Sequence, residues 1–200
     1  MYPFFETIAL LNGIPRNLPF HQNRLDSTYH FHYKRPCPYK LDKMLHEIET
    51  EQGIRQRWRF LYKEDHYSHQ LNLFQPVYPN SFVLTPIEFE YPFKYSDRHL
   101  FEQLKNHLPS TTEPILMVNN YITDTTYSNL VFYNNGYWIT PKHPLLKGTM
   151  RQSLISSGNI LEGYITREDL HLYPYFKCIN AMYNFDEARL YSTHHIKGGN

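Results

Sequence analysis

The chain has 200 residues, 41% of them hydrophobic, so it is long enough for one large domain or two small ones with a real core. Lys and Arg number 20 against 19 Asp and Glu, and the net charge of +1 provides no field that would attract nucleic acid or an anionic membrane. The chain has only two cysteines and no apolar signal segment after Met1, which predicts a cytoplasmic protein without disulfide bonds. No apolar run approaches the ~20 residues of a membrane-spanning helix, so no membrane partner is predicted.

The first part of the chain is predicted to begin with a strand over Phe4–Leu11 and a helix over about residues 19–29. A second helix follows, because four apolar residues recur at helical spacing: Leu41, Met44, Leu45 and Ile48. Gly53 is expected to end this helix, since glycine readily adopts the left-handed conformation of a helix stop.

Two segments with alternating apolar and polar residues come next, Arg55–Tyr62 and residues 70–75. They predict a β-hairpin with one buried face. Three prolines then interrupt regular structure, at positions 76, 79 and 86. We therefore predict an N-terminal domain over residues 1–86 and a C-terminal domain over residues 87–200.

The second part is predicted to hold a helix that begins at Ser96, a good N-cap, and ends before Pro109. Strands are expected over residues 115–121, 129–133 and 137–141, the last two joined by the hairpin turn Asn134-Asn135-Gly136. Helices opening at Gly148 and Thr166 and a buried strand over residues 179–183 complete the pattern. Antiparallel hairpins alternating with helices predict an α+β fold of two small domains and not a doubly wound parallel sheet.

Several common sites lack their motifs. His46-Glu47 has no second histidine at the HExxH spacing, and the two cysteines form no CxxC pair, so zinc has little support. Glycine-rich nucleotide-binding motifs are missing as well. His30 and His32 could share a metal ion only on a strand, and surface placement is the favoured alternative. No metal site is predicted.

Four segments carry a different chemistry. Asp124 stands five positions before Asn129 in a hydroxyl-rich stretch between apolar strands, and Leu-Lys-Gly-Thr-Met-Arg at residues 146–151 opens a helix. The other two are His-Gln-Asn-Arg-Leu at residues 21–25 and Lys-Tyr-Ser-Asp-Arg at residues 94–98. Together and in this order they resemble motifs of the class IV aminotransferases and 4-amino-4-deoxychorismate lyases, the fold-type IV pyridoxal-phosphate enzymes, over nearly the whole chain.

The resemblance implies a D-amino acid aminotransferase-like fold, with pyridoxal 5′-phosphate at the domain cleft, in a homodimer. Lys94, in the C-terminal domain, would bear the cofactor as a Schiff base and move protons. Asp124 would face the pyridine nitrogen, and Arg24 would contact the phosphate. The other residues implied are Gly148, Thr149 and Met150 at a helix N-terminus, Asn129, Asn180 and Ala181 beside the cofactor, and Arg98 near the substrate.

Plainer interpretations stay open for these residues. Lys94 could be a solvated surface lysine, although it stands two residues before a predicted helix N-cap whose dipole disfavours an ammonium group. Asp124 could form an Asx turn, and Arg24 could lie on an amphipathic surface. Asn180 could be satisfied by backbone groups of a buried strand.

The reaction is predicted from three positions. Asn180-Ala181 is similar to a stretch of the lyases, and Arg98 stands where they carry arginine, which favours conversion of 4-amino-4-deoxychorismate to 4-aminobenzoate and pyruvate. The first alternative is a branched-chain or D-amino acid aminotransferase, which also takes a small amino substrate. The second is a non-catalytic relic that serves as a binding or dimerisation module. Two features suggest this second alternative: Asp124 stands where the family usually has Glu, and the sequence starts about 25 residues later than in the family.

Overall fold

The computed structural model describes residues 2–198, which form two compact units. Unit 1 runs to Pro76 and also takes in Phe93–Asp97. Unit 2 holds Val77–Pro92 and the chain from Arg98 onward. The division differs from the predicted break after residue 86 in two respects: residues 77–86 join unit 2, and the Lys94 segment joins unit 1.

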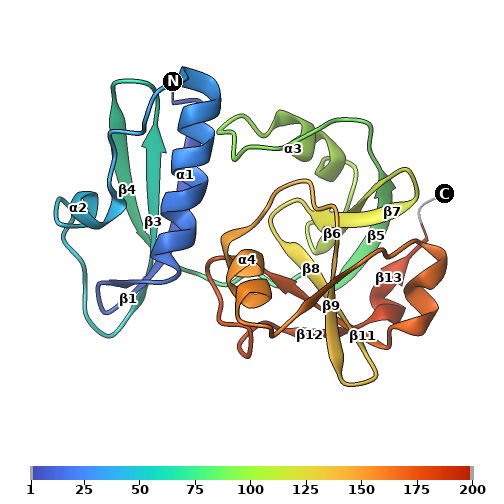
Figure 1. The fold of residues 1–200 in the computed structure, drawn as a ribbon. Coiled ribbons are helices and arrows are strands. Elements are labelled where there is room, and N and C mark those ends of the chain that lie inside the picture. The colour runs from blue at the N-terminus through green and yellow to red at the C-terminus, as the bar shows by residue number, and fades with distance from the viewer. Residues whose placement is uncertain (1, 199–200) are drawn as a thin grey trace. The chain divides into compact units, whose positions relative to one another are not determined.

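Unit 1 is a small antiparallel sheet with a helix along it (Figure 1). Within residues 2–198 its strand order is β2-β1-β3-β4, with bounds as follows: β1 Phe4–Leu11, β2 Ile14–Pro15, β3 Arg55–Tyr62 and β4 Tyr67–Leu73. The helices are α1, Leu18–Tyr33, and the short α2, Leu41–Leu45.

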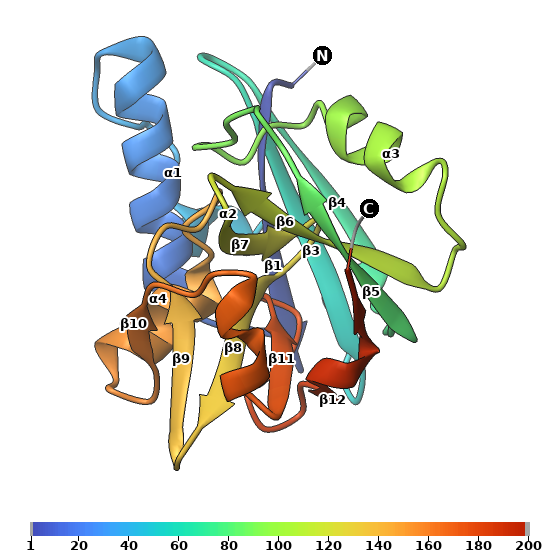
Figure 2. The same ribbon diagram turned by 90° about the vertical axis from the view of Figure 1, so that its right-hand side faces the viewer.

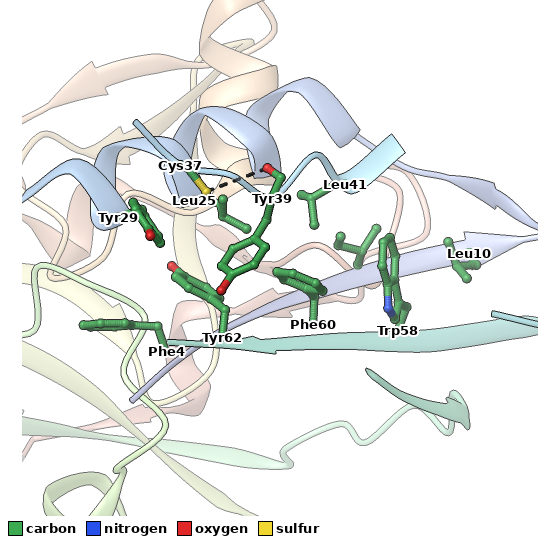
Figure 3. Packing of buried hydrophobic residues seen from close by; sticks show 11 residues of the cluster. Phe4, Leu10, Leu25, Tyr29, Cys37, Tyr39, Leu41, Trp58, Phe60 and Tyr62 are labelled. Carbon is green, nitrogen blue, oxygen red and sulfur yellow. Dashed lines mark hydrogen bonds between the residues drawn. The ribbon is translucent and has the colours of Figure 1, made fainter. Parts of the chain in front are cut away.

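One face of this sheet forms the core of unit 1. Alternate residues of β3, Trp58, Phe60 and Tyr62, are almost fully buried, as the two-residue period of a strand requires. Figure 3 shows them facing Leu25 and Tyr29 of α1.

The segment Phe93–Asp97 is joined to unit 1 by its backbone. The amide of Phe5 donates to the Lys94 carbonyl at 3.2 Å, and the amide of Ser96 donates to the Pro3 carbonyl at 2.8 Å. An antiparallel bridge also pairs Phe4 with Tyr95. Lys94 is therefore held at the edge of the sheet in unit 1.

Unit 2 is built on a larger mixed sheet (Figure 2). Its main path, for the part of the chain described, is β10-β9-β8-β7-β6-β5-β13, and β11 pairs with both β8 and β12. The strands are β5 Ser81–Pro86, β6 Thr112–Val118, β7 Tyr121–Thr125, β8 Asn129–Asn134, β9 Tyr137–Pro141, β10 Leu161–Gly163, β11 Tyr175–Ile179, β12 Leu190–Ser192 and β13 Ile196–Lys197. The helices are α3 His99–Lys105, α4 Thr149–Ser156 and the 3-10 turns η1 Glu168–Leu172 and η2 Thr193–His195.

Strand β8 has a hydrophobic cluster on each of its faces. Leu130 and Phe132 belong to one cluster, with Phe176 of β11. Val131, which points the other way, belongs to a second cluster with Leu154 of α4. Helix α4 thus lies against the sheet at β8, the strand that begins with Asn129.

Most predicted elements are confirmed, including the α+β class. The strand Phe4–Leu11 and the first strand of the hairpin, Arg55–Tyr62, have the predicted bounds. Asn135 and Gly136 both have positive φ in the predicted turn between β8 and β9. The predicted helix at Gly148 is α4, for which Gly148 is the N-cap.

Two helix boundaries were wrong. Helix α3 begins at His99, so Ser96 is not its cap; the Ser96 amide instead donates to the carbonyl of Pro3, the residue before β1. Helix α2 ends at Leu45. Gly53 does have positive φ, 81°, but it lies in the loop before β3, where its amide donates to Asn12 Oδ1 at 2.8 Å.

Two strand predictions were also wrong. The predicted strand over residues 115–121 is interrupted because Asn119 and Asn120 adopt positive φ and turn the chain from β6 into β7. The late strand is β11, which ends at Ile179 where it was predicted to begin. The chain turns there because the Asn180 side chain accepts a hydrogen bond from the Met182 amide at 2.9 Å.

Candidate functional site

Lys94 is half-buried and lies over an aromatic ring of the neighbouring strand. Its Nζ is 4.6 Å from the centre of the Phe5 ring, and the Arg59 guanidinium is 4.5 Å from the same ring. The lysine charge also acts on the buried His21, whose pKa it helps to lower after burial itself. Lys94 is thus placed within unit 1 beside two other basic side chains, unlike a solvated surface lysine.

A buried ionic cluster lies next to it in unit 1. Arg24 donates two hydrogen bonds to the Glu6 carboxylate, from Nε to Oε1 at 2.9 Å and from Nη2 to Oε2 at 2.5 Å. His21 Nδ1 lies 2.6 Å from the same Oε2. Burial favours protonated Glu6, but the charge of Arg24 and hydrogen bonds from His21 and Arg24 outweigh it and lower the pKa of Glu6 to about 2. Glu6 is therefore ionised at neutral pH.

The tautomer of His21 follows from this. Burial lowers the pKa of His21 despite the opposing effect of Glu6, so the ring is neutral at pH 7. Because ionised Glu6 can only accept, the proton of the neutral ring must be on Nδ1. Arg24 consequently supplies the cation of this cluster, with its side chain 13% exposed and its orientation fixed by a two-point contact.

In unit 2 the structure brings together Asp124 and Asn129, whose spacing was the first motif. Asn129 Nδ2 donates to Asp124 Oδ1 at 2.6 Å, and the amide of Leu146 donates to Asp124 Oδ2 at 2.9 Å. Burial raises the pKa of Asp124 to about 7, although both of these hydrogen bonds oppose the change. Asp124 is thus a buried carboxyl group poised between its two protonation states at neutral pH.

The predicted phosphate turn is built onto this pair. A Cβ atom at position 148 would lie 2.0 Å from Asn129 Oδ1, so only glycine fits there. Thr149 and Met150 follow, buried in the first turn of α4. Backbone N–H groups of a first helical turn form a favourable environment for an anion.

Arg151 fixes α4 to the sheet. Its guanidinium is buried and donates to Thr140 Oγ1 at 3.3 Å, to the Pro141 carbonyl at 2.9 Å and to Glu162 Oε1 at 2.6 Å. These partners lie on β9 and β10, beside which Figure 2 shows α4. The direction of the helix N-terminus is therefore set by a buried arginine.

Asn180 and Ala181 follow the end of β11. Asn180 Nδ2 donates to Ser128 Oγ at 3.1 Å, which ties it to the turn between Asp124 and Asn129. Glu113 holds the same turn from β6, because it accepts hydrogen bonds from the amide, at 2.9 Å, and the hydroxyl of Thr126. Ala181 is half-buried in the turn after Asn180.

Arg98 has contacts that are structural. Its Nη2 donates to the Thr126 carbonyl, and its guanidinium lies 4.5 Å from the centre of the Phe101 ring and 4.6 Å from that of Tyr127. It therefore braces the same turn as Glu113 and Asn180. These contacts offer no support for the predicted role near the substrate.

Three residues of these clusters were not among the predicted site residues: Glu6, His21 and Glu113. Glu6 was visible in sequence as a carboxylate inside an apolar strand, and His21 as the first residue of an Arg-containing motif. A charged residue at such a position must be paired, which is the signal that could have revealed the Glu6–Arg24 contact. Glu113 is recognisable only from the fold.

Two further results concern metals and membranes. Within residues 2–198 there is no group of three or more His, Cys, Asp or Glu side chains that could hold a metal ion. His30 and His32 lie on helix α1, where residues two apart do not face each other. Among the same residues no helix has the length and apolar character needed to cross a membrane.

Comparison with known proteins gives consistent matches. The family model described as Amino-transferase class IV matches residues 111–195, which include Asp124, Asn129 and the start of α4. An uncharacterized protein of Haemophilus influenzae is 31% identical over 196 residues, covering 91% of this chain and 98% of that protein.

Solved structures are similar as well. A putative 4-amino-4-deoxychorismate lyase from Haemophilus somnus superimposes with a TM-score of 0.85 at 30% identity, over 91% of this chain and 97% of that one. The PLP-bound form of a hypothetical aminotransferase from Mycobacterium tuberculosis gives a TM-score of 0.73 at 14% identity, over 98% of this chain and 82% of that one. The second match establishes similarity of fold alone.

Proposed function

The chain belongs to the class IV aminotransferase family, and we propose that it is a pyridoxal 5′-phosphate-dependent 4-amino-4-deoxychorismate lyase. Members of this family are pyridoxal-phosphate enzymes. The choice of the lyase reaction is supported by the Haemophilus somnus protein, whose name gives that activity and which this chain matches over nearly its full length.

The observation that carries cofactor binding is the state of Asp124. This carboxyl group is 4% exposed and is hydrogen-bonded by an amide side chain and by the backbone of Leu145 and Leu146, all of them neutral donors. Arg151, the cation that acts on it, is directed to other acceptors. A protonated pyridine nitrogen would supply the positive donor that this buried carboxylate lacks, so the residues fit the cofactor.

Different residues of the chain would bind different parts of the cofactor. The cofactor supplies an aldehyde for covalent attachment and a ring that takes up electron density. Lys94 would hold that aldehyde carbon through Nζ, Asp124 would keep the pyridine nitrogen protonated, and Arg24 and the first turn of α4 would bind the phosphate.

The proposed reaction breaks the bond between the substrate ring and its enolpyruvyl oxygen. The freed Lys94 amine would take the proton from the ring carbon that bears nitrogen, and the electrons left there would expel the enolpyruvate. The same amine would return the proton to the methylene carbon of the leaving group. The products are then 4-aminobenzoate and pyruvate, and all atoms of the substrate are accounted for.

The first experiment tests covalent attachment. Purified protein incubated with pyridoxal 5′-phosphate should develop an absorbance band at about 415 nm. Borohydride reduction and peptide mapping should then find the label on Lys94. Lys94→Ala should abolish the band, and Lys142→Ala, which removes an exposed lysine, should leave it unchanged. A colourless wild-type protein at saturating cofactor would contradict the proposal.

A second experiment separates the reactions. Release of pyruvate and 4-aminobenzoate without a keto-acid acceptor supports the lyase, whereas strict dependence on 2-oxoglutarate would replace it by an aminotransferase. Neither activity and no bound cofactor would leave the non-catalytic module. We also propose a cytoplasmic homodimer, which sedimentation would reveal as twice the chain mass of 24.1 kDa.

A further inference from the structure

Asn129 joins the two motifs at residues 124–129 and 146–151 through a single amide group. Its Nδ2 donates to Asp124 Oδ1 at 2.6 Å and to the Leu146 carbonyl at 2.9 Å. Leu146 closes the ring, because its amide donates to Asp124 Oδ2 at 2.9 Å. A carboxyl group, a side-chain amide and one residue's backbone thus form a closed cycle of hydrogen bonds.

The other side of the same amide is fixed by Gly148. A Cβ atom on residue 148 would lie 2.0 Å from Asn129 Oδ1 and 3.1 Å from its Cγ. Gly148 has φ −64° and ψ 144°, which any residue adopts readily, so its backbone does not require glycine. The requirement comes from Asn129, whose amide is held between Asp124 on one side and Gly148 on the other.

We infer that Asn129 is a positioning residue, which locks Asp124 and the loop at residues 145–148 into one rigid piece. The inference rests on the proposed function, because it makes the pyridine-nitrogen partner and the phosphate turn move together. Asn129 itself then needs no contact with the cofactor. Its role is to keep the carboxylate and the start of α4 in register.

This role has consequences in the cofactor-free protein. Without Asn129 the buried Asp124 carboxylate would keep only backbone donors, from Leu145 and Leu146, and a buried charge with fewer donors favours its neutral form. The Leu146 carbonyl would lose its side-chain donor as well. Both changes would loosen the loop that leads into α4.

The first test compares Asn129→Ala with Asn134→Ala, an asparagine replaced at the other end of β8. In cofactor-free protein, Asn129→Ala should raise the midpoint of the Asp124 carboxyl titration, followed by carbon NMR. It should also speed amide hydrogen exchange of Leu146 about tenfold, because the hydrogen bond from Asn129 that holds the Asp124 carboxylate, the acceptor of the Leu146 amide, is lost. Asn134→Ala should change neither. Unchanged Leu146 exchange in a folded Asn129→Ala protein would overturn the inference.

The second test uses Gly148. Gly148→Ala should displace the Asn129 amide and reproduce the effects of Asn129→Ala on Leu146 and Asp124. When Asn129→Ala and Gly148→Ala are combined, the new Cβ atom no longer meets the Asn129 amide. The effects of the two substitutions on Leu146 exchange and on the Asp124 titration should therefore not add. Fully additive effects would show that the two residues act separately and would sink the idea.

A third variant guards against simple misfolding. Asn129→Asp keeps the shape of the side chain but removes its donor, and two facing carboxyl groups can share one proton. Protection of Leu146 should therefore be lost at alkaline pH and partly recovered at mildly acidic pH. Equal protection at both pH values would contradict a role for the donor.

These readouts are independent of the proposed function. A protein that never binds pyridoxal 5′-phosphate but shows the coupled loss of Leu146 protection would refute the enzyme and keep the positioning role. A protein that forms the band at about 415 nm but shows no change of Leu146 exchange in Asn129→Ala would support the enzyme and refute the positioning role.

Discussion

Each unit contains a buried carboxyl group at the centre of its cluster, and the pKa values of the two groups are shifted in opposite directions. Glu6 in unit 1 is fully buried and its pKa is lowered to about 2, with Arg24 and His21 as partners. Asp124 in unit 2 is 4% exposed and its pKa is raised to about 7, with Asn129 and the Leu146 amide as partners. Burial acts in the same direction on both, so the difference lies in the charge of the donors.

This difference separates a carboxylate whose cation is supplied by the chain from a carboxyl group that has only neutral donors. Glu6 already has its cation, and its contact with Arg24 stabilises unit 1 at neutral pH. Asp124 is held by neutral donors, so a cationic donor that arrives from outside would stabilise its ionised form. A perturbed carboxyl group of the second kind is the better marker of a binding site.

The largest expected effect breaks the pair in unit 1. Glu6→Ala should destabilise the protein by about 3–5 kcal/mol, because it leaves the largely buried Arg24 charge without its carboxylate. Urea unfolding at pH 7 measures the change. A loss below about 1 kcal/mol would mean that Glu6 behaves like a surface carboxylate.

A pH experiment should show the two carboxyl groups acting with opposite signs. The pKa of Asp124 is raised from 3.8 to about 7, so its contribution to stability is complete below pH 3.8 and is lost as the pH rises through 7. The expected loss is on the order of 4 kcal/mol. Asp124→Asn should abolish this decline in urea unfolding measured from pH 4 to pH 8.

Glu6 should govern the acid side of the same profile. Its pKa is lowered from 4.5 to about 2, so its contribution is complete above pH 4.5 and is lost as the pH falls toward 2. Glu6→Gln should remove this acid loss and leave the decline between pH 4 and pH 8. If Glu6→Gln or Asp124→Asn changed both the acid loss of stability and the decline between pH 4 and pH 8, the two carboxyl groups would not be independent.

A smaller effect is expected for Arg24→Lys. Lysine keeps the positive charge but cannot make the two-point contact with both oxygens of Glu6, so stability should fall by about 1–2 kcal/mol. The acid limb of the pH profile should also move toward higher pH, because Glu6 is less well stabilised. An unchanged acid limb would show that charge alone, without the fork geometry, sets the pKa of Glu6.

The smallest effect is expected for Glu47→Gln, which serves as the control for the Glu6 variants. Glu47 is an exposed carboxylate in unit 1 that accepts hydrogen bonds from Tyr67 and lies 3.1 Å from His69 Nε2. Contacts of this kind in water contribute little. Its urea midpoint should match that of wild type within error, and a clear loss would blur the contrast between buried and exposed pairs.

The parts of the fold that the sequence predicted correctly depend on local chemistry. The Asn134–Gly136 turn follows from residues that tolerate positive φ, and α4 begins directly after Gly148, where the helix was predicted to open. The same reasoning should have found the turn at Asn119-Asn120, where two such residues stand between apolar runs. Ser96 failed as a cap for a non-local reason, because its amide pairs with residue 3, far away in the chain.

The candidate site shows the same division. Asp124 and Asn129 are five residues apart and flank one turn, so their contact could be expected from spacing. The Leu146 amide and Gly148 join them only because β8 and the loop before α4 are neighbours in the folded chain. Arg24 was predicted to bind an anion, and the structure shows that part of its guanidinium is already used by Glu6.

The path of the chain between the units limits how this protein can be divided. The backbone passes from one unit to the other after Pro76, after Pro92 and again after Asp97, so five residues of unit 1 lie within the sequence of unit 2. A gene break at residue 76 would yield a first fragment without Lys94 and a second fragment in which the Lys94 segment has no sheet edge to pair with. Neither unit could therefore be exchanged as one continuous block of sequence without separating Lys94 from the strand β1 that holds it.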